Sequence, residues 1–407
     1  GHDRRPPFGP SLDDFSSNGT RVSIQRGDSV PLQGVRVVDL TRILSGPFCT
    51  QLLADLGAEV IKIEGPRGDP VRYQGEIVNG LSWYFAQFNR NKKSIVLDLY
   101  NDNDKNTLSK LLRTADVLVE NFRPGILADM GFGQQALESL NPQLIHASVN
   151  GYGTVGPYAD RPSFDFIAQA MSGFMSVNGP PNGEPQRAAP PLSDLVAGLY
   201  CAFGILAAIH ERGKSGVGQQ VETSLTGGLV SMLAYLSAEY FATGAIPKRT
   251  GNDHPIVSPY GLFVAEDGMI AVAPSTDVFV ERFLGALGLK QLLSDSRYKT
   301  NEHRLQNRTS LSERINTVTC QRPVDHWITA INEAGCPCGR VMDLAEVFSD
   351  PQILAQEMVI DVPHPGRGDV KMTGFPVKLS RTPAGIQRPA PDLGQHTQEI
   401  LDQLDRQ

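Results

Sequence analysis

Cysteine is scarce in this chain of 407 residues, which has only five, at irregular spacing. So few thiols, in an odd number, exclude the disulfide frameworks of small secreted proteins. Cys336 and Cys338 form a C-x-C pair with no second pair at zinc spacing, so no metal site is expected. We therefore expect reduced, non-catalytic thiols and a reducing compartment. The cytoplasm is expected, or the mitochondrial matrix if the protein is eukaryotic.

Positive charge and long apolar runs are also lacking. The net charge is -7, which argues against a nucleic-acid-binding protein because such proteins carry a basic face. No apolar run approaches the roughly 20 residues of a membrane span, so no membrane contact is expected. Residues 1–30 are polar and rich in Gly, Ser and Pro, without the apolar segment of a secretory signal. We expect a flexible arm there.

The phosphate-binding signatures of common nucleotide folds are missing. No G-x-G-x-x-G motif opens a helix directly after an expected strand, which argues against a plain dinucleotide-binding domain. The tripeptide GKS at 213–215 resembles the end of a P-loop, but Ala208 stands where the first glycine is required. A nucleotide-bearing ligand held in another way stays open.

What the chain does show is an alternation of short apolar strands and helices. This order is typical of βαβ units, and it predicts an α/β fold with a doubly wound parallel sheet. Ligands of such sheets bind at the carboxyl ends of the strands. The strands are expected at 34–40, 59–64, 94–99, 116–122 and 144–153, with helices at 47–57, 105–115 and 134–140 between them.

A chain of this length exceeds one ordinary core, so two domains are expected. After a long apolar helix at 194–213, the pattern changes from about Gly251 to a hairpin at 260–274 and further helices. These features indicate a smaller α+β domain. We expect a large α/β domain at 31–215, linker helices and the small domain at 216–345, and a return to the large domain with a C-terminal helix at 346–407.

Cationic side chains gather in the loops at the strand ends. Each alone is typical of a solvated surface charge. Together with several glycines on one edge of a parallel sheet they indicate an anion site, because guanidinium groups and free backbone N–H groups suit phosphates. The seven cations are Arg42, Arg67, Arg72, Arg90, Lys92, Lys93 and Arg123.

One carboxylate stands in an otherwise apolar stretch, RPSFDFIAQAMSGF at 161–174. Asp165 is a favoured residue for a helix N-cap, and capping is the simplest interpretation of the segment. Ile167, Met171 and Phe174 recur at the spacing of one helix face, which predicts an amphipathic helix with this face buried. A catalytic role for Asp165 is the alternative.

Taken together, the loops resemble those of one family. The motifs are PLQGVRVVDLTRILSGPF, DLGAEVIKIE, FNRNKKSIVLDL, VENFRPG, SVNGYGTVGPYADRPSFD, GCPCGRV and LGQHT, in order from Pro31 to Thr397. By these motifs the chain resembles the class III coenzyme A transferases, also called the carnitine dehydratase/formyl-CoA transferase family. The resemblance implies a Rossmann-like large domain, a smaller domain, a ring-like chain path and an interlocked homodimer.

Within that family the chain looks most similar to the succinyl-CoA:glutarate transferases, through DLTR, NRNKKSI and YKTNEHRLQNR. Two positions depart from formyl-CoA transferase. Asp129 stands where that member has an arginine that contacts CoA, and Leu44 stands where it has a glutamine. Its glycine-rich lid is also absent, with GNDHPIVSPYG at 251–261 in the corresponding region. The detailed contacts to CoA and to the acid should therefore differ from that member.

The resemblance implies that Asp165 is the catalytic nucleophile. Asp165 would form an aspartyl-acyl anhydride and then an aspartyl-CoA thioester. Phe164 and Phe166 either shield this intermediate from water or simply pack in the core. Backbone N–H groups of Gly151 and Gly153 are candidate oxyanion donors. Succinyl-CoA and a C4–C6 dicarboxylate such as glutarate are the expected substrates, while oxalate, formate, carnitine-type and aromatic acids stay open.

Matching the motifs residue by residue gives the expected binding residues. The expected partners are an acyl-CoA and a small carboxylic acid, with no permanently bound cofactor. Arg187 and His254 are candidates for the far carboxylate of a dicarboxylic acid, from charge alone, against an ordinary surface role. The residues expected to hold CoA are Arg42, Ile43, Leu44, Ser45, Arg67, Asn89, Arg90, Asn91, Lys92, Asn121, Phe122, Arg123, Asn150, Gly151, Tyr152 and Gly153.

Two other functions stay open. An α-methylacyl-CoA racemase needs an acid/base pair poised near neutral pH. Racemases of this fold typically carry His directly before the aspartate, where this chain has Phe164. A CoA-binding or scaffold protein without catalysis is the second alternative, against which Asp165 among apolar neighbours and the complete set of loops argue.

Overall fold

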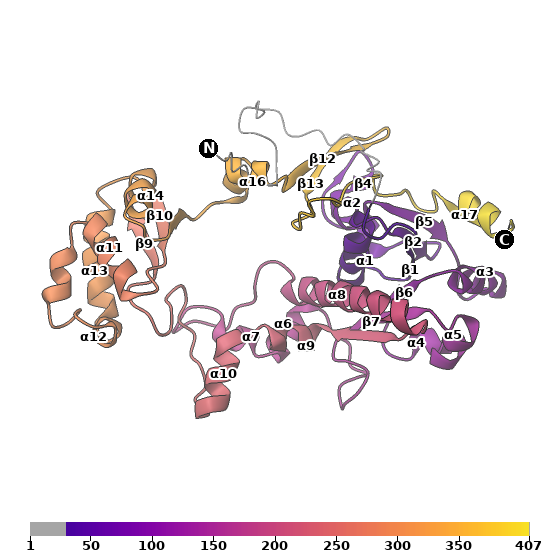
Figure 1. Ribbon diagram of the computed structural model, residues 1–407, viewed down its shortest axis with the longest axis horizontal. Helices are drawn as coiled ribbons and strands as arrows, with labels where there is room; N and C mark the ends of the chain where they lie inside the picture. The colour runs from indigo at the N-terminus through magenta and orange to yellow at the C-terminus, as the bar shows by residue number, and fades with distance from the viewer. Residues whose placement is uncertain (1–29, 407) are drawn as a thin grey trace. The chain divides into compact units, whose positions relative to one another are not determined.

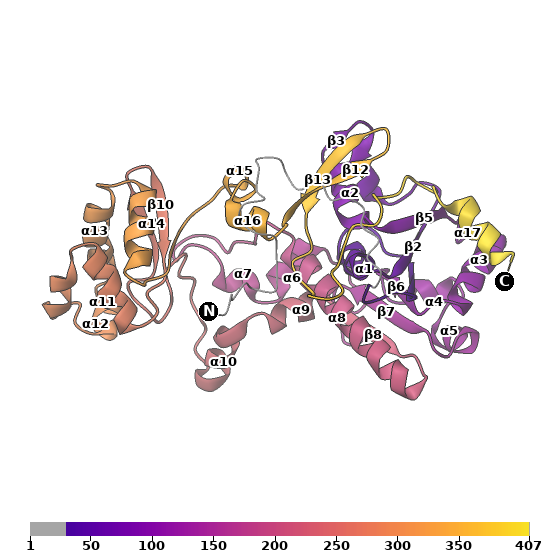
Figure 2. The ribbon, with the colours of Figure 1, turned by 45° about the horizontal axis from the view of Figure 1, so that its top comes forward.

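The computed structural model describes residues 30–406, so the expected arm lies outside the described residues apart from Val30. The chain forms two compact units (Figures 1 and 2). Of the described residues, the first unit contains 30–174, Ala188–Ala238 and 348–406. The second contains Met175–Arg187 and Glu239–Val347. The first unit is therefore built from three separate stretches of chain.

A six-stranded sheet forms the centre of the first unit, and its strands pair in parallel. This confirms the α/β fold with a parallel sheet. The sixth strand lies in a segment that sequence analysis treated as a link, because QVETS is not an apolar run and none of its residues is fully buried at the sheet edge. The strands are β1 (Arg36–Asp39), β2 (Glu59–Glu64), β5 (Lys92–Val96), β6 (Val117–Glu120), β7 (Ile145–Asn150) and β8 (Gln220–Ser224).

The strand order is β5-β2-β1-β6-β7-β8, so the direction of winding reverses at β1. From β1 the chain builds β2 and β5 on one side, and then β6, β7 and β8 on the other. The loops after β1 and β6 therefore diverge at a topological switch point. Open α/β sheets bind their ligands in the crevice at such a point.

Helices cover both faces of this sheet, because alternate residues of a strand point to opposite faces. The covering helices are α1 (Ser45–Asp55), α3 (Asp102–Arg113), α5 (Gln134–Leu140), α8 (Leu192–Ser215) and α17 (Thr397–Leu404). Val37 and Val60 share one core with α1 and α8. Val38 and Ile61 share the other core with α3, α5 and α17.

Among the described residues, α8 is the one helix long and apolar enough to cross a membrane by length and composition, with a mean hydropathy of 1.9. The expectation that no apolar run approaches that length is therefore wrong. In this unit α8 packs against α1, β7 and β8, and Ala197, Cys201 and Ile205 are buried in the core. Helices α1 and α8 approach closely at Gly198, where a Cβ atom would lie 2.4 Å from the carbonyl oxygen of Ser45.

Shorter elements complete the first unit. The hairpin of β12 (Val359–His364) and β13 (Gly368–Thr373) lies beside α2 (Trp83–Asn89), as Figure 2 shows, and Val362, Val71 and Phe85 share one core. The end of the chain is thereby joined to its first third. The other elements are η2 (Pro70–Tyr73), β3 (Ile77–Val78), β4 (Leu81–Ser82), α4 (Ile126–Asp129), α6 (Asp165–Met171), α9 (Leu225–Ser231) and α16 (Pro351–Ala355).

The second unit contains a three-stranded antiparallel sheet packed with helices around Phe263, Ile270, Phe283 and Trp327. Its first hairpin falls where the sequence predicts it. The elements are β9 (Gly261–Ala265), β10 (Gly268–Val272), α11 (Asp277–Ala286), η3 (Lys290–Ser294), α12 (Asn301–Gln306), α13 (Arg308–Thr319), α14 (Val324–Glu333), β11 (Cys338–Arg340) and α15 (Leu344–Val347). α7 (Phe174–Val177) and α10 (Ala234–Thr243) cross the unit boundaries.

The unit boundaries differ from the domain boundaries expected from the sequence. Residues 216–238 belong to the first unit, because β8 joins the large sheet and α9 packs on α8. Met175–Arg187 belongs to the second unit, where Arg249 donates to the carbonyl oxygens of Pro180 and Gly183. The change in composition near Gly251 therefore does not mark the boundary between the two units.

Candidate active site

Asp165 is the first residue of α6, and it is buried, with 9% of its surface exposed. The N-cap position is held by Phe164, and no side chain caps the helix there. Asp165 instead accepts hydrogen bonds from the side chain of Gln169 and from Ser193 of α8. The interpretation of Asp165 as the N-cap of its own helix is therefore wrong, and its carboxylate contacts the N-terminus of α8 instead.

Three donors hold the two carboxylate oxygens of Asp165. Oδ1 accepts from the backbone N–H of Ser193 at 2.9 Å and from its hydroxyl at 2.8 Å. Oδ2 accepts from Nε2 of Gln169 at 2.8 Å. The amide of Gln169 is fixed in this orientation, because its Oε1 accepts the N–H of Ala188 at 2.8 Å. All three donors are neutral, so they position the carboxylate without neutralising it.

The N-terminus of α8 supplies part of this site. Ser193 is the second residue of α8, so its N–H is one of the donors that a helix leaves unpaired. A carboxylate is favoured at this positive end of the helix dipole. Asp194 follows, and burial together with the charge of Asp165 raises the pKa of Asp194 from 3.8 to about 7. The site therefore pairs a hydrogen-bonded carboxylate with a carboxyl group that keeps its proton up to near-neutral pH.

The large apolar side chains at the start of α6 and on its outer face point away from the core of the first unit. Phe164 is 69% exposed and Phe166 is 56% exposed, and Ile167 and Met171 are exposed as well. The prediction of a buried apolar face is therefore wrong, and so is core packing for the two phenylalanines. The physical reason is that α6 turns Asp165 and its donor inward, which leaves the apolar face outside.

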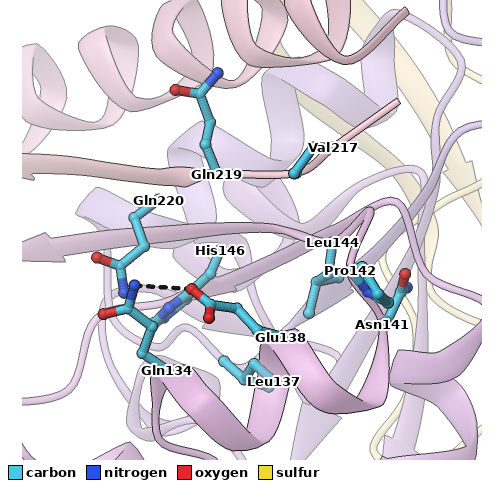
Figure 3. A pocket seen from close by; sticks show the side chains of 11 residues that line it. Gln134, Leu137, Glu138, Asn141, Pro142, Leu144, His146, Val217, Gln219 and Gln220 are labelled. Atoms are coloured by element: carbon cyan, nitrogen blue, oxygen red, sulfur yellow. Dashed lines mark hydrogen bonds between the residues drawn. The ribbon is translucent and has the colours of Figure 1, made fainter. Parts of the chain in front are cut away.

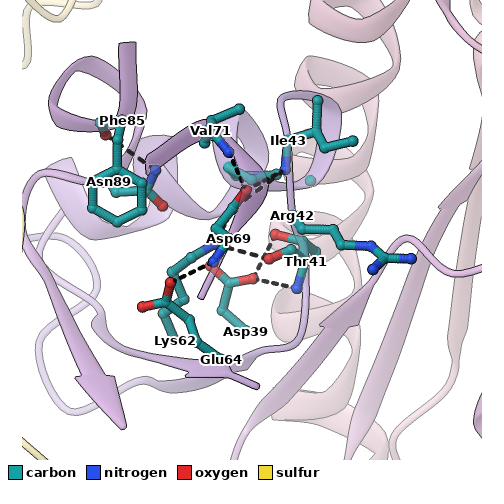
Figure 4. A network of polar contacts seen from close by, with 12 residues as sticks. Asp39, Thr41, Arg42, Ile43, Lys62, Glu64, Asp69, Val71, Phe85 and Asn89 are labelled. Carbon is teal, nitrogen blue, oxygen red and sulfur yellow. Dashed lines mark hydrogen bonds and ion pairs between the residues drawn. The ribbon is translucent and has the colours of Figure 1, made fainter. Parts of the chain in front are cut away.

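The loops after β1 and β6 are joined at the switch point. The side chain of Asn121 accepts the N–H of Arg42 at 3.0 Å and donates to its carbonyl oxygen at 2.8 Å. Ile43 has a φ of 71°, a left-handed conformation that β-branched residues rarely adopt. Asp69 accepts the N–H of Ile43 and binds Lys62 at 2.9 Å, which ties in the loop after β2 (Figure 4). The three loops form one connected edge.

The seven loop cations separate into two groups. Three of them, Arg42, Arg67 and Arg123, are exposed and have no ion pair among the residues that the structure describes. They follow β1, β2 and β6, which are neighbours in the sheet, so three guanidinium groups stand at one edge without an internal anion. The other four pair inside the unit: Arg72 with Glu64, Arg90 with Asp55, Lys92 with Asp39, and Lys93 with Glu59 and Glu399.

The segment Asn89–Lys92 is buried, and its polar side chains bind other groups of the first unit. Arg90 pairs with Asp55 at 2.7 Å, and Lys92 pairs with Asp39 at 3.2 Å. Burial lowers the pKa of Lys92 to about 8 against the attraction of Asp39. These polar groups already have partners, so a contact between their side chains and CoA stays a prediction.

The loop after β7 contains two expected glycines, and Gly151 lies beside the segment that leads into α6. A Cβ atom on Gly151 would lie 2.5 Å from Cβ of Ser163, so this approach requires glycine. Gly153 has a φ of 93° and donates its N–H to the side chain of Asn150. That N–H is therefore occupied, and its role as an oxyanion donor stays an unsupported prediction.

The remaining expected CoA residues have more varied surroundings. Leu44 and Ser45 are buried at the start of α1. Phe122 is half-buried, and the guanidinium carbon of Arg42 lies 5.9 Å from the centre of its ring. Tyr152 packs edge-on against another tyrosine with ring centres 5.8 Å apart. Leu44, Ser45 and Phe122 therefore lie in or directly beside the loops at the switch point, whereas Tyr152 belongs to the loop after β7.

The two residues expected to meet a far carboxylate belong to the second unit. They are Arg187 and His254. The ring of His254 lies 5.0 Å from that of Tyr260, and its carbonyl oxygen accepts from Arg308 at 2.7 Å. Because Asp165 belongs to the first unit, a shared role with these residues stays a prediction.

A cavity of about 250 Å³ lies at the opposite edge of the sheet (Figure 3). His146, near the start of β7, and Gln220, at the start of β8, line it together with Glu138 of α5. It contains none of the residues expected to bind CoA or to react. The cavity is therefore not part of the candidate site.

Three polar residues around Asp165 were missed by sequence analysis. Gln169 stands four residues after Asp165, a spacing at which helical side chains meet, so its signal was present. Ser193 and Asp194 directly precede an apolar helical run, which marks a helix start but not what it binds. The contact between Ser193 and Asp165 spans 28 residues, and no local pattern predicts it.

Comparison with known proteins shows which family this chain is similar to. The model of CoA-transferase family III matches residues 32–397. The acetyl-CoA:oxalate CoA-transferase of Acetobacter aceti is 39% identical over 89% of this chain and 93% of that protein. The succinyl-CoA:glutarate CoA-transferase of Homo sapiens is 36% identical over 92% of this chain and 86% of that protein.

A solved structure shows the same fold. A CAIB/BAIF family protein from Brucella suis is 36% identical and has a TM-score of 0.85, over 92% of this chain and 100% of that one. The likeness therefore covers both units and the site residues of the first. The resemblance seen in the loops is confirmed: this chain belongs to CoA-transferase family III and is a transferase that uses CoA thioesters.

Proposed function

We propose that this enzyme moves CoA from succinyl-CoA to a C4–C6 dicarboxylic acid such as glutarate. The human relative, named for succinyl-CoA and glutarate, supports these substrates, while the Acetobacter relative keeps oxalate as an alternative acceptor. The observation that carries the proposal is the buried carboxylate of Asp165 with its three neutral donors. Such a group is fixed in position for attack on an acyl carbon.

Asp165 is the nucleophile in this proposal. A carboxylate oxygen attacks the acyl carbon of succinyl-CoA, the C–S bond breaks, and CoA thiolate leaves an aspartyl-succinyl anhydride. The thiolate then attacks Cγ of Asp165, which releases succinate and leaves an aspartyl-CoA thioester. The acceptor carboxylate attacks the same carbon and displaces the thiolate. The thiolate finally attacks the acyl carbon of the acceptor, which frees Asp165.

A carboxylate suits this chemistry better than a hydroxyl or thiol. The anhydride stays activated, so a weakly nucleophilic carboxylate in the second half of the reaction has an intermediate it can attack. Water is the competing nucleophile, and the burial of Asp165 limits its access. The enzyme therefore conserves the thioester energy by restricting which groups reach one carbon.

Phosphate groups of CoA bind at the switch point in this proposal. The exposed guanidinium groups of Arg42, Arg67 and Arg123 supply the positive charge. Arginine suits this role because its fork of N–H donors matches phosphate oxygens. Binding energy from the nucleotide end then positions the thioester for attack.

Two copies of the chain form a homodimer in this proposal. The helices α6, α8 and α9 pack on one another in the first unit. They expose large apolar side chains, including Phe164, Met171, Phe203 and Val230. Soluble monomers rarely expose so many apolar groups together, so a second copy is the expected cover.

The reducing compartment stays a prediction. All five cysteines are free thiols, which suits the cytoplasm or the mitochondrial matrix.

Racemase activity in addition to transfer is the second candidate function. A racemase must move a proton at the α-carbon, and Asp194 is a carboxyl group near Asp165 whose pKa lies near neutrality. Against it, Phe164 stands where racemases carry histidine. Incubation of an α-methylacyl-CoA in heavy water separates the two, since a racemase incorporates deuterium at the α-carbon and a transferase does not.

A matrix of acyl-CoA donors and carboxylic acid acceptors tests the proposed function. We expect the highest kcat/KM for succinyl-CoA with glutarate or a related dicarboxylate. The variants Asp165→Asn and Asp165→Ala should lose at least about 1,000-fold in kcat because they lack the nucleophile. Asp160→Asn, at a nearby exposed carboxylate, is the control and should keep activity. Normal transfer by the Asp165 variants would refute the mechanism.

A further inference from the structure

The proposed mechanism requires that negative charge be stabilised on the nucleophile itself. In both middle steps, attack on Cγ of Asp165 produces a tetrahedral carbon, and one oxygen of this side chain becomes an oxyanion. An oxyanion that forms in a buried site needs hydrogen-bond donors already in place. The N–H of Gly153 is donated to Asn150 and is not free for this purpose.

The two oxygens of Asp165 have unequal surroundings. Oδ1 has two donors, the N–H and the hydroxyl of Ser193, at 2.9 and 2.8 Å. Oδ2 has one, Nε2 of Gln169 at 2.8 Å. Ser193 is 0% exposed, so both of its donors act away from water. Their position is fixed by the first turn of the 24-residue helix α8.

We infer that Ser193 is the oxyanion donor for Asp165 itself, with Oδ1 as the oxygen that bears the charge and Oδ2 as the oxygen that attacks. This inference rests on the proposed function. Oδ2 keeps a lone pair for the acyl carbon, and it becomes the bridging oxygen of the anhydride. When the thiolate attacks Cγ, the double bond to Oδ1 opens and its electrons move onto that atom.

The same geometry serves the steps that follow. Collapse of the first tetrahedral intermediate reforms the bond to Oδ1 and breaks the bond from Cγ to Oδ2, which leaves with succinate. The acceptor carboxylate then attacks Cγ, Oδ1 again takes the charge, and the thiolate leaves on collapse. The oxygen from the acceptor takes the place of Oδ2. Ser193 therefore acts at both steps on Cγ but not at the first attack on succinyl-CoA.

This division of steps gives the test. Ser193→Ala removes the hydroxyl and keeps the N–H, so the anhydride should still form while its conversion to aspartyl-CoA slows. Loss of one oxyanion donor typically lowers kcat by roughly 100- to 1,000-fold. Rapid quenching after mixing with succinyl-CoA, followed by mass spectrometry of the Asp165 peptide, should show aspartyl-CoA forming about 100-fold more slowly.

A second readout separates catalysis from packing. Hydroxylamine added during turnover attacks the succinyl carbonyl of the anhydride, which releases succinyl hydroxamate and frees the carboxylate of Asp165; this product is measured above the amount that succinyl-CoA forms without enzyme. Ser193→Ala should raise the ratio of hydroxamate to aspartyl-CoA at least about tenfold, since the anhydride waits longer for attack on Cγ. A purely structural role would lower both products in proportion. Ser193→Thr, which keeps a hydroxyl, should restore the ratio.

A matched control is available on α6. Ser172 is buried and donates its hydroxyl to the carbonyl oxygen of Gln169 at 3.2 Å, without contact to the carboxylate of Asp165. Ser172→Ala should leave the ratio unchanged. If Ser193→Ala does not fold, Ser193→Cys tests the same point, because its weaker donor should also raise the ratio.

The inference and the proposed function fail in different ways. An unchanged rate and ratio in the folded Ser193 variants would overturn the role of Ser193, while aspartyl-CoA still forms in the parent enzyme. Absence of any adduct on Asp165 in the parent enzyme during full turnover would instead overturn the proposed function.

Discussion

Asp194 is the residue near the site whose ionisation is most affected by its surroundings. Burial and the charge of Asp165 raise its pKa to about 7, whereas an unfolded chain ionises it near the ordinary value of 3.8. The folded protein therefore binds one more proton between these values, so this group makes the free energy of unfolding fall as pH rises from about 4 to about 7. Tyr84 and Asp165 are the titratable groups that interact with it.

Replacing Asp194 with asparagine should remove this penalty. A shift of about three pKa units corresponds to up to about 4 kcal/mol at alkaline pH. We expect Asp194→Asn to be more stable than the parent at about pH 8 by at least about 1 kcal/mol, and to show little difference near pH 4. Urea unfolding at both pH values measures this. A variant that is less stable at pH 8 would contradict the assigned ionisation.

The three exposed arginines give a prediction about binding. Alanine at Arg42, Arg67 or Arg123 removes a charge-assisted hydrogen bond to a phosphate, which is worth about 1.5–3 kcal/mol. Each variant should therefore raise KM for succinyl-CoA about 10- to 100-fold, with a smaller change for the acceptor acid. Steady-state kinetics at low ionic strength measures both constants.

The control for the arginines lies on α3. Arg113 is exposed at the end of that helix, and Arg113→Ala should leave both KM values unchanged. An equal rise in KM for the Arg113 variant would indicate general electrostatic attraction. No rise in KM for any of the three loop arginine variants would refute the binding of CoA at the switch point.

At the level of single residues, sequence reasoning identified the proposed nucleophile but not the groups that bind it. Asp165 and the loop arginines stand in motifs that could be matched. The loop cations could not be sorted by sequence, because Arg90 and Arg123 look alike until Asp55 is seen to pair with the first. Ser193 reaches Asp165 only through the packing of α8 on α6.

At the level of elements, the packing of α8 on α1 depends on one glycine. A Cβ atom at Gly198 would lie 2.4 Å from the carbonyl oxygen of Ser45, which is backbone and cannot move aside. Gly198→Ala should therefore destabilise the protein by about 1–3 kcal/mol, as overpacked cores do. Thermal or urea unfolding measures the change.

The same helix supplies the matched comparison. Gly213 also lies in α8, and an added Cβ atom there would meet nothing within 4 Å. Gly213→Ala should stabilise the protein by up to about 1 kcal/mol, because alanine favours helices. Equal effects of the two substitutions would show that the close contact between α1 and α8 is not the reason why alanine at position 198 destabilises the protein.

The sequence predicted the elements whose apolar residues recur with a clear period. It did not predict the strand at the sheet edge or the surface that an exposed apolar face covers. Strands β1, β2, β6 and β7 place apolar side chains in the two cores between the helix layers, so their composition reports their position. The edge strand β5 is KKSIV, and of its residues only Ile95 belongs to a core. β8 lies at the edge and lacks that signal. The apolar period of α6 was recognised, but its orientation was reversed, since periodicity does not say which surface a face covers.

At the level of the whole molecule, the exposed apolar helices predict self-association. Phe203 on α8 is 69% exposed, and a charge there should oppose a second copy. We expect the parent to have the mass of a dimer by light scattering and Phe203→Glu to shift toward the monomer, with an unchanged circular dichroism spectrum. Tyr100→Glu, at a residue 89% exposed in a loop before α3, is the control and should stay dimeric. A monomeric parent protein would refute the homodimer.

The most direct test of the nucleophile follows an oxygen atom. When enzyme loaded with aspartyl-CoA reacts once with glutarate labelled with ¹⁸O, the labelled carboxylate bridges to Cγ of Asp165. Attack by the thiolate on the acyl carbon of glutarate then leaves one labelled oxygen on the enzyme. Mass spectrometry of the peptide containing Asp165 should therefore find one ¹⁸O atom on that side chain. Formation of glutaryl-CoA with no ¹⁸O at Asp165 would contradict the mechanism.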